Sequence, residues 1–222
     1  METEATHTFL FADLAGFTAL TEAHGDFEAA DLVGDFTTAA RKLLAEHQGR
    51  EVKTIGDALM IAGSDAGGAV RLGLRLAHEV GGCHGMPSVR VGMHTGAAVE
   101  RDGDFIGAAV NVAARISALA GGDQVILSEA TRDAAGTMPD VALHTLGIHT
   151  FKNVGSPLTI FEALWLSEEA ELRHLPIDPV CRMAIDPDRE AGRLAYEGTE
   201  FHFCSLKCAG AFSADPERYA SR

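Results

Sequence analysis

The sequence predicts an α+β fold followed by a small second module, and three observations carry this prediction. Strand-like apolar runs and amphipathic helical segments alternate as strand, helix, strand, strand, helix, strand along the first half of the chain. This is the ferredoxin-like βαββαβ order. A charged segment then precedes a short C-terminal region that holds three of the four cysteines.

The individual elements follow from apolar periodicity and from the residues that stop each run. The first hairpin has its turn at Gly56 and Asp57, and Gly121 and Gly122 end the helix that begins near Gly107. We expect helices at residues 26–49, 66–80, 107–120 and 128–136, and strands at 7–13, 50–55, 58–63, 88–100, 124–128, 142–151 and 157–164.

The chain divides into a first domain at residues 1–165, a connector at 166–176 and a C-terminal module at 177–222. The connector is rich in charged residues, and Pro176 would end the helix that we expect there. The C-terminal module is too short to bury a large core by itself.

The composition excludes several classes of partner. The chain has 32 acidic and 18 basic residues, and a net charge of −14 argues against nucleic acid or an anionic membrane as the main partner. The N-terminus lacks the charged start and apolar core of a signal peptide, and no apolar run reaches membrane-spanning length. We therefore expect a cytoplasmic protein whose cysteines serve as thiol ligands or redox groups.

Two aspartates stand where predicted strands end. Asp13 lies in the stretch TFLFADLAGFT, which contains no Lys or Arg to pair with it, and Asp57 lies in the hairpin turn. These two positions can lie side by side in the predicted topology, and neighbouring carboxylates repel unless cations sit between them. Such pairs hold Mg²⁺ beside substrate phosphates. The alternative is that Asp57 is a turn residue and Asp13 a helix cap.

Four sequence blocks occur along the first domain in the order FLFADLAGFTAL, VKTIGDALM, GMHTG and DFIGAAVNVAARI. Together they resemble the class III nucleotidyl cyclase catalytic domain over residues 5–165. The resemblance implies an adenylate cyclase that converts ATP to 3′,5′-cyclic AMP and pyrophosphate with two Mg²⁺ or Mn²⁺ ions per site. It also implies a head-to-tail homodimer in which each site draws residues from both chains.

The resemblance assigns metal and base-binding roles residue by residue. Asp13, Asp57 and the backbone carbonyl of Leu14 match the metal ligands of the family. Lys53 and Asp104 match its base-recognising pair in the adenine-selective form. Adenine offers an acceptor at N1 and a donor at its amine, which Lys and Asp complement.

The remaining assignments concern the sugar and the phosphates. Asn111 and Arg115 match the ribose-orienting asparagine and the transition-state arginine, and four-residue spacing puts them on one helix face. Arginine offers a planar, permanently charged fork that suits phosphoryl oxygens. Lys152 matches a lysine that binds the triphosphate.

The C-terminal segments DPVCRM, FHFCSLKC and ADPERY resemble the YHS domain, a short metal-associated module. Cys204 and Cys208 are four residues apart at the start of a predicted helix, and the fold could bring Cys181 to them. Tetrahedral thiolate sites normally have four ligands, and His202 or Asp178 could be the fourth for a soft metal such as Zn or Cu. Alternatively, the cysteines are small buried hydrophobes or redox-reactive thiols.

Arg182 stands where the YHS pattern usually has glycine, which bears on the backbone conformation after Cys181. The tandem arrangement leads to the hypothesis that a metal or oxidant at the cysteines changes the dimer geometry through the connector.

Three other functions stay open at this point. A guanylate cyclase is disfavoured by the pair Lys53 and Asp104. A catalytically silent nucleotide-binding or dimerisation domain would leave the thiol cluster as the working part, but it would not need the intact set of metal and transition-state residues. A ferredoxin-like RNA binder would need a basic face and an exposed aromatic stripe, which the sequence lacks.

Overall fold

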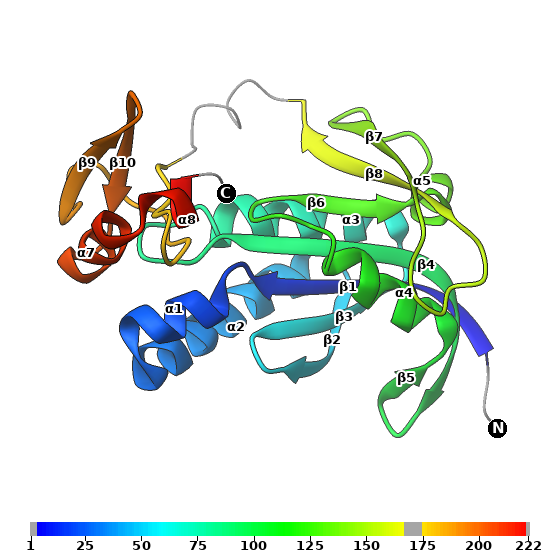
Figure 1. Ribbon diagram of the computed structural model, residues 1–222. Coiled ribbons are helices and arrows are strands. Elements are labelled where there is room, and N and C mark those ends of the chain that lie inside the picture. Colours follow the sequence, from blue (N-terminus) through cyan, green and yellow to red (C-terminus); the bar gives the residue numbers. More distant parts are fainter. Residues whose placement is uncertain (1–3, 167–174, 221–222) are drawn as a thin grey trace.

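The computed structural model describes residues 4–166 and 175–220, and Figure 1 shows their arrangement. The first half of the chain forms the predicted βαββαβ unit, with the strands in the sheet order β2-β3-β1-β4. This confirms the ferredoxin-like prediction. The elements of this unit are β1 (Glu4–Leu14), α1 (Phe17–His24), α2 (Asp26–Glu46), β2 (Gly49–Ile55), β3 (Ala58–Gly63), α3 (Ala66–Arg75), a π-helical turn (Leu76–Val80) and β4 (Val89–Arg101).

The second part of the first domain extends the same sheet beyond β4 in the order β6-β8-β7, while the short β5 pairs with the end of β4. The pairing of β4 with β6 is parallel, whereas the other strand pairs of this sheet are antiparallel. The elements are β5 (Asp104–Ile106), α4 (Ala108–Ser117), β6 (Val125–Ser128), α5 (Glu129–Ala135), β7 (Val141–His149) and β8 (Leu158–Trp165).

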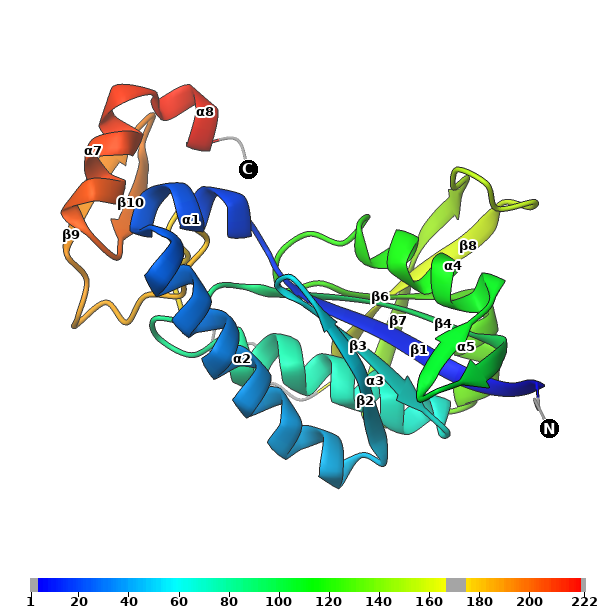
Figure 2. The same ribbon diagram turned by 90° about the horizontal axis from the view of Figure 1, so that it is seen from below.

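The central strand β1 has a different set of buried side chains on each face. Leu10, Ala12 and Leu14 pack with side chains of α2 and α3, whereas Phe9 and Phe11 pack with side chains of α4 and β5. Figure 2 shows α2 and α3 on one side of the sheet and α4 on the other. Because side chains alternate along a strand, Asp13 continues the row of Phe9 and Phe11 and so belongs to the face that α4 covers.

The C-terminal module consists of β9 (Gly192–Tyr196), β10 (Thr199–Phe203), α7 (Leu206–Ala214) and α8 (Pro216–Ala220). Its core is shared with the first domain, because Leu20 of α1 and Ala29 of α2 belong to the same buried cluster as Phe203 and Phe212. Figures 1 and 2 both show α1 beside this module. The sharing agrees with the expectation that so short a segment cannot bury a large core alone.

Backbone hydrogen bonds also join the module to the loop before β4. The N–H of Ser88 donates to the carbonyl of Arg182 at 2.9 Å, and the N–H of Ala184 donates to the carbonyl of Met86 at 2.9 Å. Pro87 and Met183 form an isolated β-bridge between these two hydrogen bonds. The module is therefore attached to the first domain by main chain as well as by apolar packing.

The structure corrects several element predictions. The sequence analysis did not predict α1, which Gly25 separates from α2 with a φ of +94° that an ordinary residue avoids. The helix predicted to reach Gly49 ends at Glu46, because Gln48 adopts a φ of 53°. Nor was β5 predicted; the segment before it forms a tight hairpin turn at Asp102 and Gly103, both with positive φ.

Two further expectations concern the C-terminal part. The helix expected in the connector falls mostly on residues 167–174, which lie outside the described residues. Arg182 adopts a φ of 64°, the left-handed conformation that a glycine takes easily, so the backbone keeps this form without glycine. Among the helices that the structure describes, none is both long and apolar enough to cross a membrane.

Candidate functional site

A cavity of about 430 Å³ opens at the end of β1. Asp13 lies opposite Ala58 in the pairing of β1 with β3, and Asp57 immediately precedes Ala58 in the hairpin turn. The two predicted aspartates are therefore brought together. The cavity is lined by Asp13, Leu14, Gly16, Phe17, Thr18, Ala19, Glu22, Asp57, Arg90 and Arg218.

The electrostatics of this cavity reflect the crowding of two carboxyl groups. The pKa of Asp57 is raised to about 7, first by burial and then by hydrogen bonding to Asp13 and repulsion from its charge. A cation placed between the two groups would relieve this repulsion. Carboxylate oxygens beside an open cavity are the donors that Mg²⁺ and Mn²⁺ prefer, so the residues fit the divalent ions that the sequence predicts.

Arg90 is a residue of this cavity that sequence reasoning missed. It lies opposite Asp13 in the pairing of β1 with β4, and its Nε donates to Asp13 Oδ2 at 2.8 Å while Nη2 donates to the same oxygen. The surrounding stretch supplies Asp13 with no cation, as the sequence indicated, but a strand 77 positions away does. Only the register of β4 against β1 reveals this partner.

Arg218 belongs to α8 and brings a side chain of the C-terminal module to the rim of the same cavity. Sequence reasoning missed this contribution, because Arg218 lies in a segment assigned to the other module. The cavity at Asp13 and Asp57 is thus built by both parts of the chain.

The predicted base-binding pair forms an ion pair on the sheet. Lys53 Nζ lies 2.5 Å from Asp104 Oδ2, and the backbone N–H of Phe105 donates to Asp104 Oδ1 at 2.8 Å. The hydrogen bond from Lys53, and next the one from Phe105, lower the pKa of Asp104. Both charged side chains are about 40% exposed, so a ligand can reach them.

The other predicted residues lie away from the cavity at Asp13. Asn111 is exposed and Arg115 half-buried, and both belong to α4. Lys152 is exposed in the loop between β7 and β8. Within the part of the chain that the structure describes, the lining of that cavity includes none of Lys53, Asp104, Asn111, Arg115 and Lys152.

A second cluster of donor atoms lies between the two parts of the chain. The sulfur atoms of Cys181 and Cys204 are 3.5 Å apart, and those of Cys204 and Cys208 are 3.8 Å apart. The fourth member is His24 of α1, whose Nε2 lies 3.6 Å from Cys204 Sγ and 3.8 Å from Cys208 Sγ. All four donor atoms lie within 4.8 Å of one another.

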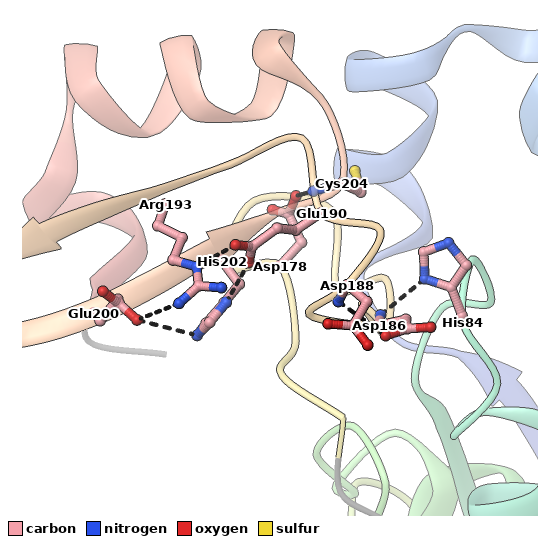
Figure 3. Close-up of polar contacts among 9 residues, drawn as sticks. All are labelled: His84, Asp178, Asp186, Asp188, Glu190, Arg193, Glu200, His202 and Cys204. Carbon is pink, nitrogen blue, oxygen red and sulfur yellow. Dashed lines mark hydrogen bonds and ion pairs between the residues drawn. The ribbon is translucent and has the colours of Figure 1, made fainter.

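Neither residue that the sequence offered as fourth ligand occupies this place. His202 turns its Nδ1 to Glu190 Oε2 at 2.6 Å, and the buried Asp178 accepts the backbone N–H of Cys204 at 2.9 Å (Figure 3). The sequence missed His24 because it is 180 positions from Cys204 and lies in a helix that the periodicity did not predict.

Hydrogen bonds among the thiols shift the pKa values of the cysteines in this cluster in opposite directions. Hydrogen bonds from the thiols of Cys181 and Cys204 lower the pKa of Cys208. The same hydrogen bonding, first with Cys204, raises the pKa of Cys181. This hydrogen bonding therefore favours a negative charge on Cys208 over one on Cys181.

The sheet order and the placement of the cavity at the end of β1 define a ferredoxin-like domain of the nucleotidyl cyclase type. The chain belongs to the family described as the adenylate and guanylate cyclase catalytic domain, which it matches over residues 1–159. Residues 177–222 match the YHS domain. Both resemblances that the sequence analysis noted are confirmed.

Curated relatives are named adenylate cyclase. Those of Streptomyces coelicolor and Streptomyces griseus are each 40% identical to this chain, over 56% and 54% of it and over 34% and 30% of their own lengths. A relative in Mycobacterium tuberculosis, named as a pH-sensitive adenylate cyclase, is 37% identical over 60% of this chain and 33% of its own length. The chain spans about a third of the length of these relatives.

Solved structures share the fold. The adenylyl cyclase CyaB from P. aeruginosa has a TM-score of 0.66 at 21% identity, covering 76% of this chain and 98% of that one. The guanylyl cyclase Cya2 has a TM-score of 0.61 at 24% identity, covering 75% of this chain and 95% of that one. Because both kinds of cyclase share the fold, the fold alone does not distinguish ATP from GTP.

Proposed function

We propose that this protein is an adenylate cyclase that converts ATP to 3′,5′-cyclic AMP and pyrophosphate as a head-to-tail homodimer. The observation that carries the proposal is the meeting of Asp13 and Asp57 in one cavity, together with the raised pKa of Asp57. The names of the curated relatives favour the same activity. The division at residues 1–165, 166–176 and 177–222 is part of this proposal.

Asp13 and Asp57, with the backbone carbonyl of Leu14, would hold two Mg²⁺ or Mn²⁺ ions. Bound there, these ions would lower the pKa of the ribose 3′-hydroxyl and neutralise charge on the phosphates. The deprotonated 3′-oxygen attacks the α-phosphorus, the bond to the β-phosphate oxygen breaks, and pyrophosphate leaves. Arg90 neutralises part of the charge on Asp13, which limits the repulsion between the carboxylates before the ions arrive.

Selection of adenine rests on Lys53 and Asp104. Lys53 would donate to N1 of the base and Asp104 would accept from its amine, and guanine reverses both groups. In the free protein the two side chains form an ion pair with each other, and this keeps them close enough to bind the same base. Their exposure leaves them accessible to a base that arrives from a second chain.

The dimer follows from the separation of the two groups of residues. Asn111 would orient the ribose and Arg115 would stabilise the charge that develops on the transferred phosphoryl group, while Lys152 would bind the triphosphate. These residues do not line the described cavity that Asp13 and Asp57 form in the same chain. A second copy, turned head to tail, would bring its α4 over that cavity and would complete two equivalent sites.

The test is complementation between two inactive variants. Asp57→Ala and Arg115→Ala are each expected to lower cyclic AMP formation at least about 100-fold. A mixture of equal amounts of the two variants should regain up to about a quarter of the wild-type activity, because about half of the dimers are heterodimers and each heterodimer carries one intact site of two. Lack of recovery in a mixture that forms heterodimers would contradict shared sites.

A control and a second nucleotide complete the experiment. Lys42→Ala removes a positive charge from the exposed surface of α2 and should leave turnover near the wild-type value. Formation of cyclic GMP in preference to cyclic AMP would assign a guanylate cyclase instead. If a dimeric wild-type protein forms neither cyclic AMP nor cyclic GMP, a catalytically silent nucleotide-binding domain becomes the better assignment.

A further inference from the structure

We propose that His24, Cys181, Cys204 and Cys208 form a tetrahedral zinc site that joins the cyclase domain to the C-terminal module. The imidazole comes from α1 of the first domain, and the three thiolates come from the module. The structure thus assigns the fourth ligand to the cyclase domain, outside the segment that matches the YHS domain.

The geometry of the four donor atoms fits zinc closely. With Zn–S bonds of about 2.3 Å and a Zn–N bond of about 2.05 Å, tetrahedral angles give sulfur–sulfur distances of about 3.8 Å and sulfur–nitrogen distances of about 3.6 Å. Two of the sulfur–sulfur distances are 3.5 and 3.8 Å, two of the sulfur–nitrogen distances are 3.6 and 3.8 Å, and the remaining pairs of donor atoms lie within 4.8 Å. A disulfide would need its sulfurs at about 2.05 Å, so the thiols are placed for a shared ion.

The imidazole of His24 is oriented as a metal ligand. Its Nε2 faces the sulfurs of Cys204 and Cys208, while its Nδ1 lies 3.2 Å from Oε1 of Glu28, which is in the first turn of α2. Metal-bound histidines usually donate their other nitrogen to such an acceptor, which fixes the tautomer and the ring plane. Only 10% of the His24 side chain is exposed, so the ring is held between the two domains.

The thiols are held in place by main-chain contacts. The hydroxyl of Ser205 accepts the backbone N–H of Cys208 and caps α7, which fixes the turn that carries Cys204 and Cys208. Asp178 accepts the backbone N–H of Cys204, as Figure 3 shows, and the same carboxylate accepts the backbone N–H of Cys181 at 3.4 Å. The three sulfurs therefore converge before an ion is added.

Four protein ligands without an open position indicate a structural ion. Cys181 and Cys208 are completely buried, and catalytic zinc sites keep a position for water or substrate. Zinc accepts three thiolates and one imidazole in tetrahedral geometry without redox chemistry. The ion would fix α1 on the module and would do no chemistry of its own.

The position of α1 matters because this helix follows the catalytic strand directly. Gly16, which precedes α1, lines the cavity of Asp13, and a Cβ placed on it would lie 2.7 Å from Cγ of Arg182. Arg182 adjoins Cys181, and its carbonyl accepts from Ser88, whose own carbonyl accepts from Ala15 at 2.8 Å. Zinc is therefore expected to order the segment between the end of β1 and α1.

The first experiment measures zinc in the purified full chain by mass spectrometry and its affinity by competition with a chromophoric chelator. The wild type should hold one equivalent, and His24→Ala should bind at least about 10-fold more weakly. In the Co²⁺-substituted protein, His24→Cys should restore tight binding and give the spectrum of four thiolate ligands instead of three.

Two matched variants control for indirect effects. His84→Ala removes a different contact between the domains, the acceptor of the Asp186 backbone N–H, but no donor atom of the cluster (Figure 3). Cys83→Ser removes the exposed thiol outside the cluster. Both should keep wild-type zinc affinity and an unchanged Co²⁺ spectrum.

The outcomes separate the proposal from its rivals. Wild-type zinc affinity in His24→Ala would overturn the assignment of His24, and His24→Cys keeps this test decisive if the alanine variant folds poorly. A wild type that binds Cu⁺ but not Zn²⁺, or that isolates as a disulfide without metal, would overturn the zinc site. Hydrogen exchange should quicken in α1 when zinc is removed, and unchanged exchange there would contradict the ordering of this segment.

Discussion

Asp13 and Asp57 present oxygen donors to an open cavity, whereas the sulfurs of Cys181, Cys204 and Cys208 lie closed between two domains. The oxygen site is short of ligands, and its charges repel one another. The sulfur site has four convergent donors within one chain. An incomplete site can admit a substrate and depends on further groups, while a complete site can only hold its ion.

This difference fits the two separate uses of metal that we propose for this chain. Hard divalent ions would act at the cavity and exchange with solvent, because Mg²⁺ keeps several waters and binds through few carboxylates. Zinc would stay bound through repeated turnovers because thiolates hold it tightly.

Asp13→Asn should lower cyclic AMP formation about 1,000-fold, because it removes the charge of a proposed metal ligand and leaves Arg90 without its anionic partner. The zinc content of the same variant should stay at the wild-type value. Turnover and metal analysis on one preparation test both statements. Loss of zinc together with activity would mean that the two sites are not separate.

The double substitution Lys53→Glu with Asp104→Cys should change the preferred nucleotide from ATP to GTP by about 100-fold in the ratio of kcat/KM values. Each single substitution should lower activity with both nucleotides, because it leaves one member of the ion pair unmatched. Steady-state assays with ATP and GTP measure this ratio. A double variant that still prefers ATP would show that Lys53 and Asp104 do not select the base.

Removal of zinc from the full chain by a strong chelator should lower the Tm by roughly 6 to 12 °C. Binding of an ion far above its Kd stabilises the folded state by about 3 kcal/mol, and about 1 kcal/mol shifts the Tm of a chain of this size by 2 to 4 °C. Differential scanning calorimetry measures the change. His24→Ala should respond much less to the chelator, whereas His84→Ala should behave as the wild type.

Asp57→Asn should stabilise the metal-free protein by about 1 kcal/mol at pH 8 and have little effect at pH 4. The folded-state pKa of about 7 lies above the usual value, so the folded protein binds this proton more tightly than the unfolded chain. Wild-type stability therefore falls as the pH rises from about 4 to about 7. Partial exposure of Asp57 limits the size of the effect.

Urea unfolding at a series of pH values tests this prediction. Asp65→Asn is the control, because its free energy of unfolding should change in the opposite direction. Asp65 accepts the N–H of Gly68 and caps α3; asparagine keeps this capping oxygen but loses the negative charge at the helix N-terminus, so the amide variant should be slightly less stable at neutral pH. A gain in stability of Asp57→Asn that does not change with pH would contradict the assigned pKa.

Arg218→Ala should raise the KM for ATP by about 2- to 5-fold with little change in kcat, because a rim charge attracts the phosphates without touching the reacting atoms. Arg193→Ala removes an equal charge from the same module, at a site paired with Glu190, and should leave KM unchanged. If both variants raise the KM equally, the KM responds only to the net charge of the module and not to the position of Arg218.

The sequence was sufficient for the parts of the structure that local rules govern. The meeting of Asp13 and Asp57 follows from strand order and from one turn, and both can be read from periodicity. Arg90, His24 and Arg218 could not be found in this way. Each is brought to its place by tertiary packing, through the register of β4, the docking of α1 and the position of α8.

Backbone conformation set a second limit on sequence reasoning. The left-handed φ of Arg182 and the break at Gly25 decide where the module and α1 lie, but neither leaves a mark in hydrophobic periodicity. The YHS pattern usually has glycine at the position of Arg182, so an arginine there did not suggest a left-handed backbone conformation. The surrounding hydrogen bonds of Arg182 with Asp178 and Ser88 hold this conformation in place.

The mixed core of α1 and the C-terminal module has a consequence for synthesis of the chain. Leu20 leaves the ribosome early, but its partners Phe203 and Phe212 come about 190 residues later. At about 5–20 residues per second, roughly 10 to 40 s separate them. During this interval, nascent α1 would expose an apolar face that a chaperone can bind, and the cyclase domain would complete its folding only after residues 203–212 have left the ribosome.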